Sequence, residues 1–339
     1  MSKIKLSFCI TTFNSEEFIS ATLESIVSQF GKDIEIIIGD SSSNSATEII
    51  TKKFSKEFQN IVYKRLNDEG FGIDLSTTIS YARGEYCWLF SSDDCIKDGA
   101  IDHIKGLIAL SKASVLLCNR TICSRDLVPI KNSPNWLLGD KNTKKFDFNH
   151  IDELNNYINN SESIGSLFSY MSTVIFKKDE WDKIPIKKPY MNSPYQHVWR
   201  IIQILKEKNT TFYYTDKQLV LFRGDNDSFR VKRENDKFER DGYPARIYLD
   251  FDGYKEIINY YFKNKKIITS FKKLMQREHP FYSSLIRVRS ELKTKKDWEK
   301  FEKKLIYYNY SSIQIYLINF IGSKNFLVLF LRKLKKIIN

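Results

Sequence analysis

Short apolar runs alternate with longer amphipathic segments through the first 90 residues of the chain. Four runs have the β-branched and aromatic character of strands: Ile4–Ile10, Ile34–Ile38, Ile61–Arg65 and Tyr86–Phe90. Three segments between them repeat apolar residues at helical spacing: Ser15–Ser28, Ala46–Phe58 and Leu75–Ala82. Because runs such as IEIII leave no polar face, this order predicts an α/β, Rossmann-like fold with a mostly parallel sheet and helices on both faces.

Polar residues follow the predicted strands at the point where each strand ends. Three of the strands are followed by Thr11–Asn14, Asp40–Asn44 and Ser91–Asp94. The loop after the remaining strand, Ile61–Arg65, carries Asp68, Glu69 and Asp74. The carboxyl ends of parallel strands meet at one edge of the sheet, which is where ligands bind in such folds. The chain has neither a GxGxxG motif after the first strand nor a GxxxxGK[ST] motif, which argues against a dinucleotide enzyme and a P-loop.

Asp93 and Asp94 place two adjacent carboxylates directly after an apolar strand. Two like charges side by side repel, and burying them costs free energy unless a cation or hydrogen bonds compensate. One interpretation is a polar loop in which an Asp caps the next helix. The other is a site for Mg²⁺ or Mn²⁺, because hard cations prefer carboxylate oxygens and need only one or two when phosphates and water complete the shell. The polar ends of the neighbouring strands favour the metal site.

Three segments of the first 100 residues resemble family 2 glycosyltransferases of the GT-A fold: LSFCITTFNSEEFISATLESIVSQ, EIIIGDSSSNSATEII and ARGEYCWLFSSDD. Two positions depart from many members, because Thr12 stands where they have Pro and Gly39-Asp40 stands where they have two Asp residues. More narrowly, EYCWLFSSDD, SYMSTVIFKKDEW and SPYQHVWRI are similar to the abequosyltransferase-like branch, which transfers dideoxyhexoses in O-antigen assembly. The resemblance implies an inverting enzyme that moves a sugar from a nucleotide-sugar donor to a hydroxyl of a surface-polysaccharide intermediate. The basic C-terminal region adds the expectation that this acceptor is lipid-linked.

The same resemblance implies roles for the strand-end residues. Thr11 and Phe13 would flank the nucleotide base, and Asp40 would hydrogen-bond the base or the ribose. Asp93 would lie near the ribose, and Asp94 would bind the Mn²⁺ or Mg²⁺ ion that bridges the diphosphate of a UDP, CDP, GDP or dTDP sugar. The cation would neutralise the charge that develops on the diphosphate as the bond to the sugar breaks.

Some of these residues also have an ordinary structural interpretation. Asp40 followed by three serines is common turn and N-cap chemistry, although the other strand ends favour the site. Asp74 and Arg83 are weaker donor-binding candidates: either could contact the nucleotide, but a solvated helix residue is the favoured interpretation of both. Arg223, at the end of the strand in QLVLFRGDNDSF, could place a positive charge over the diphosphate or form a surface ion pair.

An inverting transferase needs a general base for the acceptor hydroxyl. Family members commonly use an Asp from a Glu-Asp pair at the start of a helix, where this chain instead has SPYQHVW, residues 193–199. His197 falls near the expected position, and an imidazole can accept a proton at neutral pH. The alternative is a structural histidine on an amphipathic helix. Asp179, Glu180 and Asp182 are further candidates, although KKDEWDK is also typical of a solvated helix start.

The chain divides into three predicted regions: a nucleotide-sugar-binding half (1–125), an acceptor-binding half (126–230) and a helical, basic C-terminal region (231–339). We expect a helix at Ile101–Leu110, strands at Ser114–Cys118 and Thr173–Phe176, and an irregular polar loop at Pro129–Asn149. Residues 1–100 hold 10 basic and 15 acidic residues, whereas residues 255–339 hold 20 basic and 6 acidic residues. The apolar run Phe326–Leu331, followed by RKLKK, fits a helix on an anionic membrane surface or one packed onto the domain.

Composition sets the remaining expectations. The five cysteines form no CxxC motif and are expected to be reduced thiols, and no secretory signal or apolar stretch of about 20 residues is visible. We therefore expect a cytoplasmic protein, peripheral on the inner face of the cytoplasmic membrane.

Two alternative functions compete with a glycosyltransferase. One is a nucleotidyltransferase, which would usually show a Gly-rich basic loop after the first strand. Another is a nucleic-acid-binding protein, suggested by the net charge of +13; because the first 100 residues are acidic, we expect no nucleic-acid partner.

Overall fold

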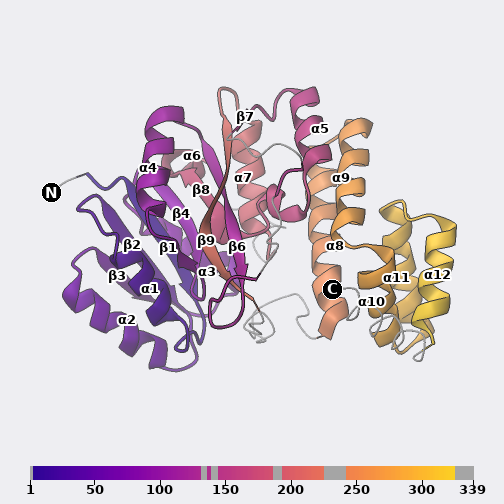
Figure 1. The fold of residues 1–339 in the computed structure, drawn as a ribbon, viewed down its shortest axis with the longest axis horizontal. Coiled ribbons are helices and arrows are strands. Elements are labelled where there is room, and N and C mark those ends of the chain that lie inside the picture. The colour runs from indigo at the N-terminus through magenta and orange to yellow at the C-terminus, as the bar shows by residue number, and fades with distance from the viewer. Residues whose placement is uncertain (1–2, 131–135, 139–143, 186–192, 225–241, 325–339) are drawn as a thin grey trace.

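The computed structural model describes residues 3–130, 136–138, 144–185, 193–224 and 242–324, and its centre is a sheet of nine strands (Figure 1). The strands are β1 (Leu6–Thr12), β2 (Ile34–Asp40), β3 (Ile61–Arg65), β4 (Tyr86–Ser91), β5 (Cys95–Ile96), β6 (Val115–Cys123), β7 (Lys144–Phe146), β8 (Val174–Lys177) and β9 (Phe212–Arg223). The helices of the sheet region are α1 (Ile19–Val27), α2 (Ala46–Glu57), α3 (Phe71–Ser80), α4 (Ala100–Ser111), α5 (Ile151–Asn160), α6 (Lys178–Asp182) and α7 (Gln196–Lys206). Two short 3₁₀ helices, η1 (Ile164–Leu167) and η2 (Met171–Thr173), precede β8.

The sheet is mostly parallel in its first half and mixed in its second half. Its strand order is β3-β2-β1-β4-β8-β6-β9-β5, and β7 pairs with β9. β1 pairs in parallel with both β2 and β4, with Thr12 opposite Asp40 and Thr11 opposite Ser91. β8 runs antiparallel to β4 and β6. The prediction of a mostly parallel α/β sheet is confirmed, and the register brings the polar ends of β1, β2 and β4 to one edge.

Two hydrophobic cores lie on opposite faces of the sheet because successive strand residues point to opposite sides. Phe8 and Trp88 belong to the core that also contains residues of α1 and α4. Cys9 and Leu89, their immediate neighbours, belong to the other core, which contains residues of α3 and α7. Helices therefore cover both faces, as the continuously apolar strands predict.

Part of the predicted polar loop at Pro129–Asn149 is regular and buried. Residues 144–146 form β7, and Phe146 packs edge-on against Tyr157, with ring centroids 4.8 Å apart. Phe148 packs against Phe212 with centroids 5.4 Å apart. The expectation of an irregular loop is thus wrong for this stretch, because isolated aromatic residues among polar ones gave no periodic signal and yet fill the core.

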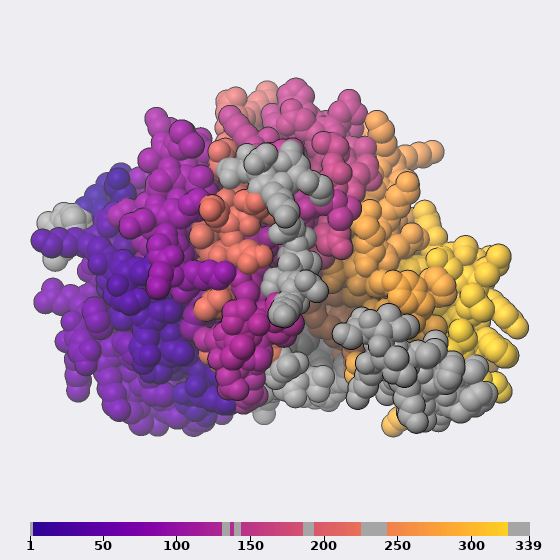
Figure 2. All heavy atoms as spheres, in the orientation of Figure 1, coloured from indigo at the N-terminus to yellow at the C-terminus, as the bar shows by residue number. Residues whose placement is uncertain are grey.

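The C-terminal helices extend outward from the sheet region: the first two pack against it and the others lie beyond them, as Figures 1 and 2 show. They are α8 (Gly242–Tyr261), α9 (Lys265–Glu278), the π-helical turn η5 (Phe281–Leu285), α10 (Ile286–Glu291), α11 (Lys295–Tyr307) and α12 (Ser312–Gly322). Phe251, Tyr254 and Leu274 are buried in the same core as Leu89. None of the helices in the described residues combines the length and the apolar character needed to traverse a bilayer. The segment Phe326–Leu331 and the RKLKK sequence after it lie outside the described residues.

Candidate active site

A cavity of about 450 Å³ lies at the carboxyl edge of the sheet, where β1 and β4 end opposite α7, α8 and α9. Six of the sequence-predicted site residues line it: Thr11, Phe13, Asp93, Asp94, His197 and Arg223. Arg246 and Leu249 of α8 and Glu278 of α9 complete the opposite wall. Residues from both ends of the chain therefore share one cavity.

Asp94 is almost completely buried at the floor of this cavity, with 1% of its surface exposed. Its Oδ2 accepts hydrogen bonds from the hydroxyls of Tyr170 and Ser172, and its Oδ1 accepts one from the backbone N–H of Arg223 at 3.1 Å. Burial and the neighbouring charge of Asp93 raise the pKa of Asp94 to about 7, although the three hydrogen bonds act in the opposite direction. Two adjacent carboxylates thus face one cavity under mutual repulsion.

The Asp93–Asp94 pair fits a divalent cation. A carboxylate oxygen can accept at two lone pairs, so Oδ1 of Asp94 retains capacity beyond its bond to Arg223, and a cation would relieve the repulsion between the two charges. No cluster of three or more His, Cys, Asp or Glu side chains that could hold a metal ion occurs in the described ranges. A cation at Asp94 would therefore need further ligands from a substrate, as the oxygens of a diphosphate could supply.

Arg223 holds the loop that carries Asp93. Its Nε donates to the carbonyl of Asp93 at 2.8 Å, its Nη1 donates to the carbonyl of Arg125, and its guanidinium carbon lies 4.7 Å from the ring centre of Phe18. Since Arg223 also borders the cavity, its positive charge lies beside the two carboxylates. The structure thus places it at the site, with much of its donor capacity used by backbone carbonyls.

Asp40 and Asp74 lie beside the cavity but are not among the residues that line it. β1 separates β2 from β4, so Asp40 and the end of β4 are two strand spacings apart, about 10 Å. The Oδ2 of Asp40 accepts a 2.7 Å hydrogen bond from the Tyr63 hydroxyl. The Ser41 hydroxyl donates to Asp74 at 2.6 Å. Both carboxylates shape the loop after β2, and their contact with a nucleotide stays a prediction.

Gly39 explains one of the two departures from the family pattern. A Cβ atom at this position would lie 1.9 Å from the Thr78 hydroxyl oxygen, so a side chain here would collide with α3. Thr11 in turn donates to that hydroxyl at 3.3 Å. The close approach of α3 to β2 thus requires glycine where many relatives carry a first Asp, and it leaves Asp40 as the sole carboxylate of that pair.

His197 lies in the first turn of α7 and is 2% exposed. Its Nε2 lies 2.9 Å from the carbonyl oxygen of Phe168, which can only accept, so Nε2 carries the proton. Its Nδ1 is buried and makes no hydrogen bond within the described residues. Burial lowers the pKa of His197 to about 4, against the raising effect of the Phe168 and Ser169 backbones. The ring is therefore neutral at physiological pH, with an unused lone pair on Nδ1 in a residue that lines the cavity.

The weaker charged candidates lie away from the cavity. Arg83 donates to the buried Glu35 through its backbone N–H and its guanidinium, at 2.6–2.9 Å, just before β4 begins. Asp179, Glu180 and Asp182 lie on α6, which begins where β8 passes the start of β4, with Lys177 opposite Tyr86. These residues are at the amino edge of the parallel strands, opposite the site.

A polar cluster from α7 to α9 lies behind the far wall, with Tyr195 and Arg246 lining the cavity, and it was not predicted. The Asp250 carboxylate accepts hydrogen bonds from the Tyr195 hydroxyl and, at 2.9 Å, from Arg246, and its other oxygen lies 3.1 Å from Nε2 of His279. Burial alone would raise the pKa of Asp250, but Arg246 and His279 hold it below its usual value. Glu278 accepts from the backbone N–H of Ile164 at 2.9 Å. No motif joins these residues, because they come from three separate segments.

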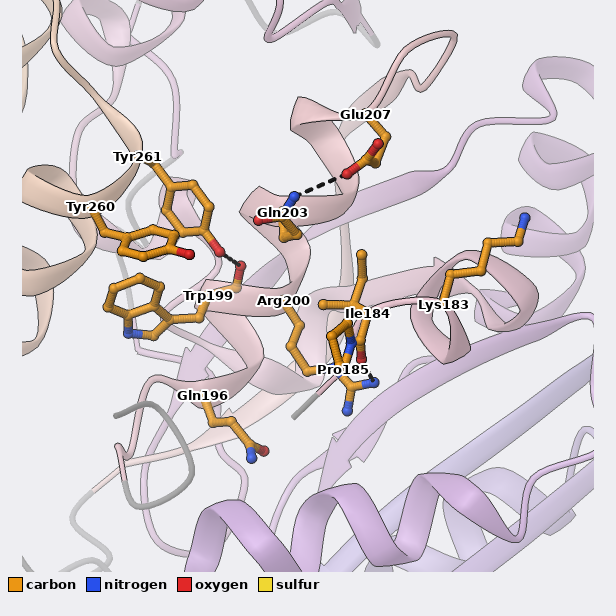
Figure 3. A pocket seen from close by; sticks show the side chains of 10 residues that line it. All are labelled: Lys183, Ile184, Pro185, Gln196, Trp199, Arg200, Gln203, Glu207, Tyr260 and Tyr261. Atoms are coloured by element: carbon orange, nitrogen blue, oxygen red, sulfur yellow. Dashed lines mark hydrogen bonds between the residues drawn. The ribbon is translucent and has the colours of Figure 1, made fainter. Parts of the chain in front are cut away.

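A second cavity of about 250 Å³ runs along α7 and shares none of its described lining residues with the first (Figure 3). Trp199 and Tyr260 pack edge-on with ring centroids 5.1 Å apart. Arg200 donates to the carbonyls of Trp181 and Ile184, and Gln203 donates to Glu207 at 2.9 Å. Because these polar groups bond within the wall, we place the chemistry in the larger cavity.

The chain is similar to known proteins along most of its length. Residues 7–176 match the family model described as glycosyl transferase family 2. The abequosyltransferase RfbV of Salmonella typhimurium is 33% identical over 287 residues, which cover 83% of each chain. The GalNAc(5)-diNAcBac-PP-undecaprenol beta-1,3-glucosyltransferase of Campylobacter jejuni is 28% identical over 102 residues, 30% of this chain and 33% of that one.

Two solved structures share the fold at low sequence identity. TarS residues 1–349 of S. aureus, in complex with UDP, superpose with a TM-score of 0.62 and 17% identity, covering 90% of this chain and 80% of that one. The mannosyltransferase PcManGT of Pyrobaculum calidifontis, in complex with GDP-Man and Mn²⁺, gives a TM-score of 0.52 and 9% identity, with 96% and 89% of the chains covered. At this level of identity, the likeness establishes the fold alone.

Proposed function

The chain belongs to glycosyl transferase family 2 and has the GT-A fold, and from this we propose that it transfers a sugar from a nucleotide-sugar donor to a hydroxyl of a surface-polysaccharide intermediate. One observation carries the proposal. A single cavity brings the Asp93–Asp94 pair at the sheet edge together with His197 and the polar wall of α8 and α9. A transferase needs a donor side and an acceptor side that meet, and we assign both to this cavity.

The sheet edge is the donor side in this proposal. Thr11 and Phe13 line the cavity next to the carboxylates and would flank the nucleotide base. Asp93 would lie near the ribose, and Asp94 would hold Mn²⁺ or Mg²⁺. When bound, such a cation supplies charge neutralisation at the departing diphosphate. Arg223 adds a fixed positive charge at the same edge, and Asp40 and Asp74 hold the adjoining loop in shape.

The helical wall is the acceptor side. We assign His197 as the group that takes the proton from the acceptor hydroxyl, because the Phe168 carbonyl fixes its tautomer and leaves Nδ1 as an acceptor. The acceptor oxygen would form a bond to the anomeric carbon as the bond from that carbon to the diphosphate breaks, and the hydroxyl proton would pass to Nδ1. A single displacement of this kind inverts the anomeric configuration.

The relatives support a class of donor and a class of acceptor. The similarity to an abequosyltransferase supports a nucleotide-activated deoxyhexose as donor, and the similarity to a transferase named for a polyprenyl-diphosphate acceptor supports a lipid-linked acceptor. The 20 basic residues among residues 255–339 support a location at the inner surface of the cytoplasmic membrane. In this proposal, residues 1–125 form the donor side and residues 126–230 the acceptor side. Residues 231–339 form a helical region that contributes to the acceptor wall and to the membrane contact.

The proposal is tested by a thermal-shift screen of UDP, CDP, GDP and dTDP sugars, with Mn²⁺ or with EDTA. At 100 times the dissociation constant, a ligand stabilises the folded protein by about 2.7 kcal/mol, so a genuine donor gives a clear shift. We expect one nucleotide class to stabilise the protein in the presence of Mn²⁺. His197→Ala should keep that shift and lose turnover. Stabilisation by none of the four classes would contradict the proposed function, and normal turnover of the variant would remove His197 from the mechanism.

A further inference from the structure

Arg120 lies in β6 and lines the candidate cavity, although the sequence-based predictions gave it no role. The pairing of β6 with β9 is irregular on both sides of Asn119, directly before Arg120. In an unbroken strand, Cys118 and Arg120 would point to the same face. Instead, Cys118 packs in the core of α1 and α4, whereas Arg120 stacks on Trp136 of the opposite core. The irregularity turns Arg120 toward the cavity, as β-bulges beside active sites often do.

Three aromatic rings hold the guanidinium group in place. Its central carbon lies 4.0 Å from the ring centre of Tyr170, 4.7 Å from that of Phe222 and 5.2 Å from that of Trp136. Stacking restricts the orientation of a guanidinium but leaves the N–H donors at its edge unused. Throughout the described ranges, no carboxylate pairs with this group and no acceptor receives a hydrogen bond from it. Arg120 is thus a fixed cation whose donors have no partner in the part of the chain that the structure describes.

The other two arginines that line the described cavity are engaged differently. Arg246 donates to Asp250 at 2.9 Å, so its charge is balanced by a carboxylate. Arg223 donates to two backbone carbonyls. Burial lowers the pKa of Arg120, whereas the neighbouring Tyr170, Asp94 and Glu278 raise it and the charge of Arg246 lowers it further. A guanidinium in this setting stays protonated and gains most from an anionic partner.

Arg120 and Asp94 are linked through one side chain. The Tyr170 ring lies under the guanidinium, and the Tyr170 hydroxyl donates to Asp94. The cation of Arg120 is therefore placed at the same end of the cavity as the carboxylate pair. An anion that binds Arg120 directly would lie next to any cation held at Asp94.

We propose that Arg120 binds the diphosphate of a substrate through the paired N–H donors of its guanidinium, and that this diphosphate is the leaving group of the nucleotide-sugar donor. The inference rests on the proposed function, because it assigns the anion to the donor. Planar guanidinium donors match two oxygens of a phosphate, and charge-assisted bonds of this kind are about twice as strong as neutral ones. As the sugar leaves, its bonding electrons pass to the diphosphate oxygen, and Arg120 would stabilise the added negative charge.

The test is calorimetric titration of the full chain with UDP, CDP, GDP and dTDP and with the corresponding nucleosides. Arg120→Met keeps the apolar stem and removes the charge and the donors, and Arg287→Gln removes a surface guanidinium of α10 as the matched control. We expect Arg120→Met to weaken the nucleoside diphosphate about 10- to 100-fold and to leave the nucleoside unchanged. The control should bind both as the wild type does. A merely structural role would instead lower the melting temperature of the unliganded variant, which we expect to be unchanged or higher.

Each other outcome has a definite meaning. Unchanged diphosphate affinity in Arg120→Met overturns the inference, whereas failure of the wild type to bind any of the four nucleotides overturns the proposed function itself. A loss confined to farnesyl diphosphate, titrated in parallel, also overturns the inference, because it would assign the Arg120 contact to a lipid-linked acceptor and not to the donor. Should Arg120→Met not fold, Arg120→Lys keeps the charge without the paired donors. A several-fold loss in that variant supports the inference, and wild-type affinity contradicts it.

Discussion

Replacing Asp94 by Asn should stabilise the ligand-free protein at alkaline pH. The wild-type carboxylate is buried beside Asp93, and its pKa is raised from 3.8 to about 7. A raised pKa means that the folded state binds the proton more tightly than the unfolded state does. The extra stability that this bound proton gives the folded state is fully present below pH 3.8 and is lost as the pH rises through 7. The amide in the Asp94→Asn variant has no such proton to lose, and it can still accept from the Arg223 N–H while donating to the Tyr170 and Ser172 hydroxyls.

The size of the effect follows from the shift. Each pKa unit corresponds to about 1.36 kcal/mol, so a displacement from 3.8 to about 7 is worth about 4 kcal/mol over the full range. Between pH 5 and pH 8, the wild type should lose about 2–3 kcal/mol relative to Asp94→Asn. Urea unfolding of both proteins in EDTA at the two pH values measures this difference directly.

A surface variant separates this effect from the mere loss of a charge. Asp126 is exposed in the loop after β6, so Asp126→Asn should follow the wild type at both pH values. Equal destabilisation of Asp94→Asn at pH 5 and pH 8 would refute the reasoning, since it would mean that the carboxylate is not held under repulsion. The variant should in any case lose transferase activity, because the proposed cation ligand is gone.

Four further predictions concern the base and the scaffold. The pKa of His197 is lowered to about 4, so the wild type should lose up to about 3 kcal/mol of unfolding free energy as the pH drops from 6.5 to 4. His197→Gln should not show this loss, and urea unfolding of the two proteins at acidic pH measures the difference. In assays of turnover, His197→Gln should be about 100- to 10,000-fold slower, and a rate near that of the wild type would exclude it as the base. Glu35→Gln weakens the charge-assisted hydrogen bonds that Arg83 donates to a fully buried carboxylate, and it should lower the free energy of unfolding by about 1–3 kcal/mol. Donor binding should be retained. A loss of donor affinity at unchanged stability would argue against a purely structural role for Glu35. Gly253→Ala places a Cβ 2.4 Å from the Tyr195 ring and should lower the free energy of unfolding by about 1–3 kcal/mol. In Gly106→Ala on α4, the added Cβ meets no atom within 4 Å, so this variant should be more stable by about 0.5–1 kcal/mol. Equal melting temperatures for the two variants would show that α8 does not press on Tyr195.

The first half of the fold could be predicted because its signals are local. Continuous apolar strands such as residues 34–38 allow no face toward water, and the polar residues after each strand mark the edge where the cavity lies. The placement of Asp93, Asp94 and Thr11 at that edge followed from parallel pairing, which the register confirms. By contrast, the antiparallel insertion of β8 between β4 and β6 has no local signal, because it depends on which strands meet after the chain has returned.

The far wall of the cavity could not be predicted because its parts are distant in sequence. Tyr195 donates to Asp250, whose other oxygen lies 3.1 Å from His279, yet the three residues come from segments that lie far apart along the chain. Arg120 did carry a signal, since a charged residue inside the apolar run VLLCNRTIC is unusual for a buried strand. Only the irregular pairing at Asn119 and the aromatic rings around the guanidinium show where that charge is directed.

The most direct test of the account is a crystal structure of the full chain with Mn²⁺ and the nucleoside diphosphate that stabilises it most. We expect the base between Thr11 and Phe13, the cation on Asp94, and the diphosphate within hydrogen-bonding distance of Arg120. Density for the nucleotide in the smaller cavity beside Trp199, or on the surface away from Asp93 and Asp94, would contradict the assignment of the donor site.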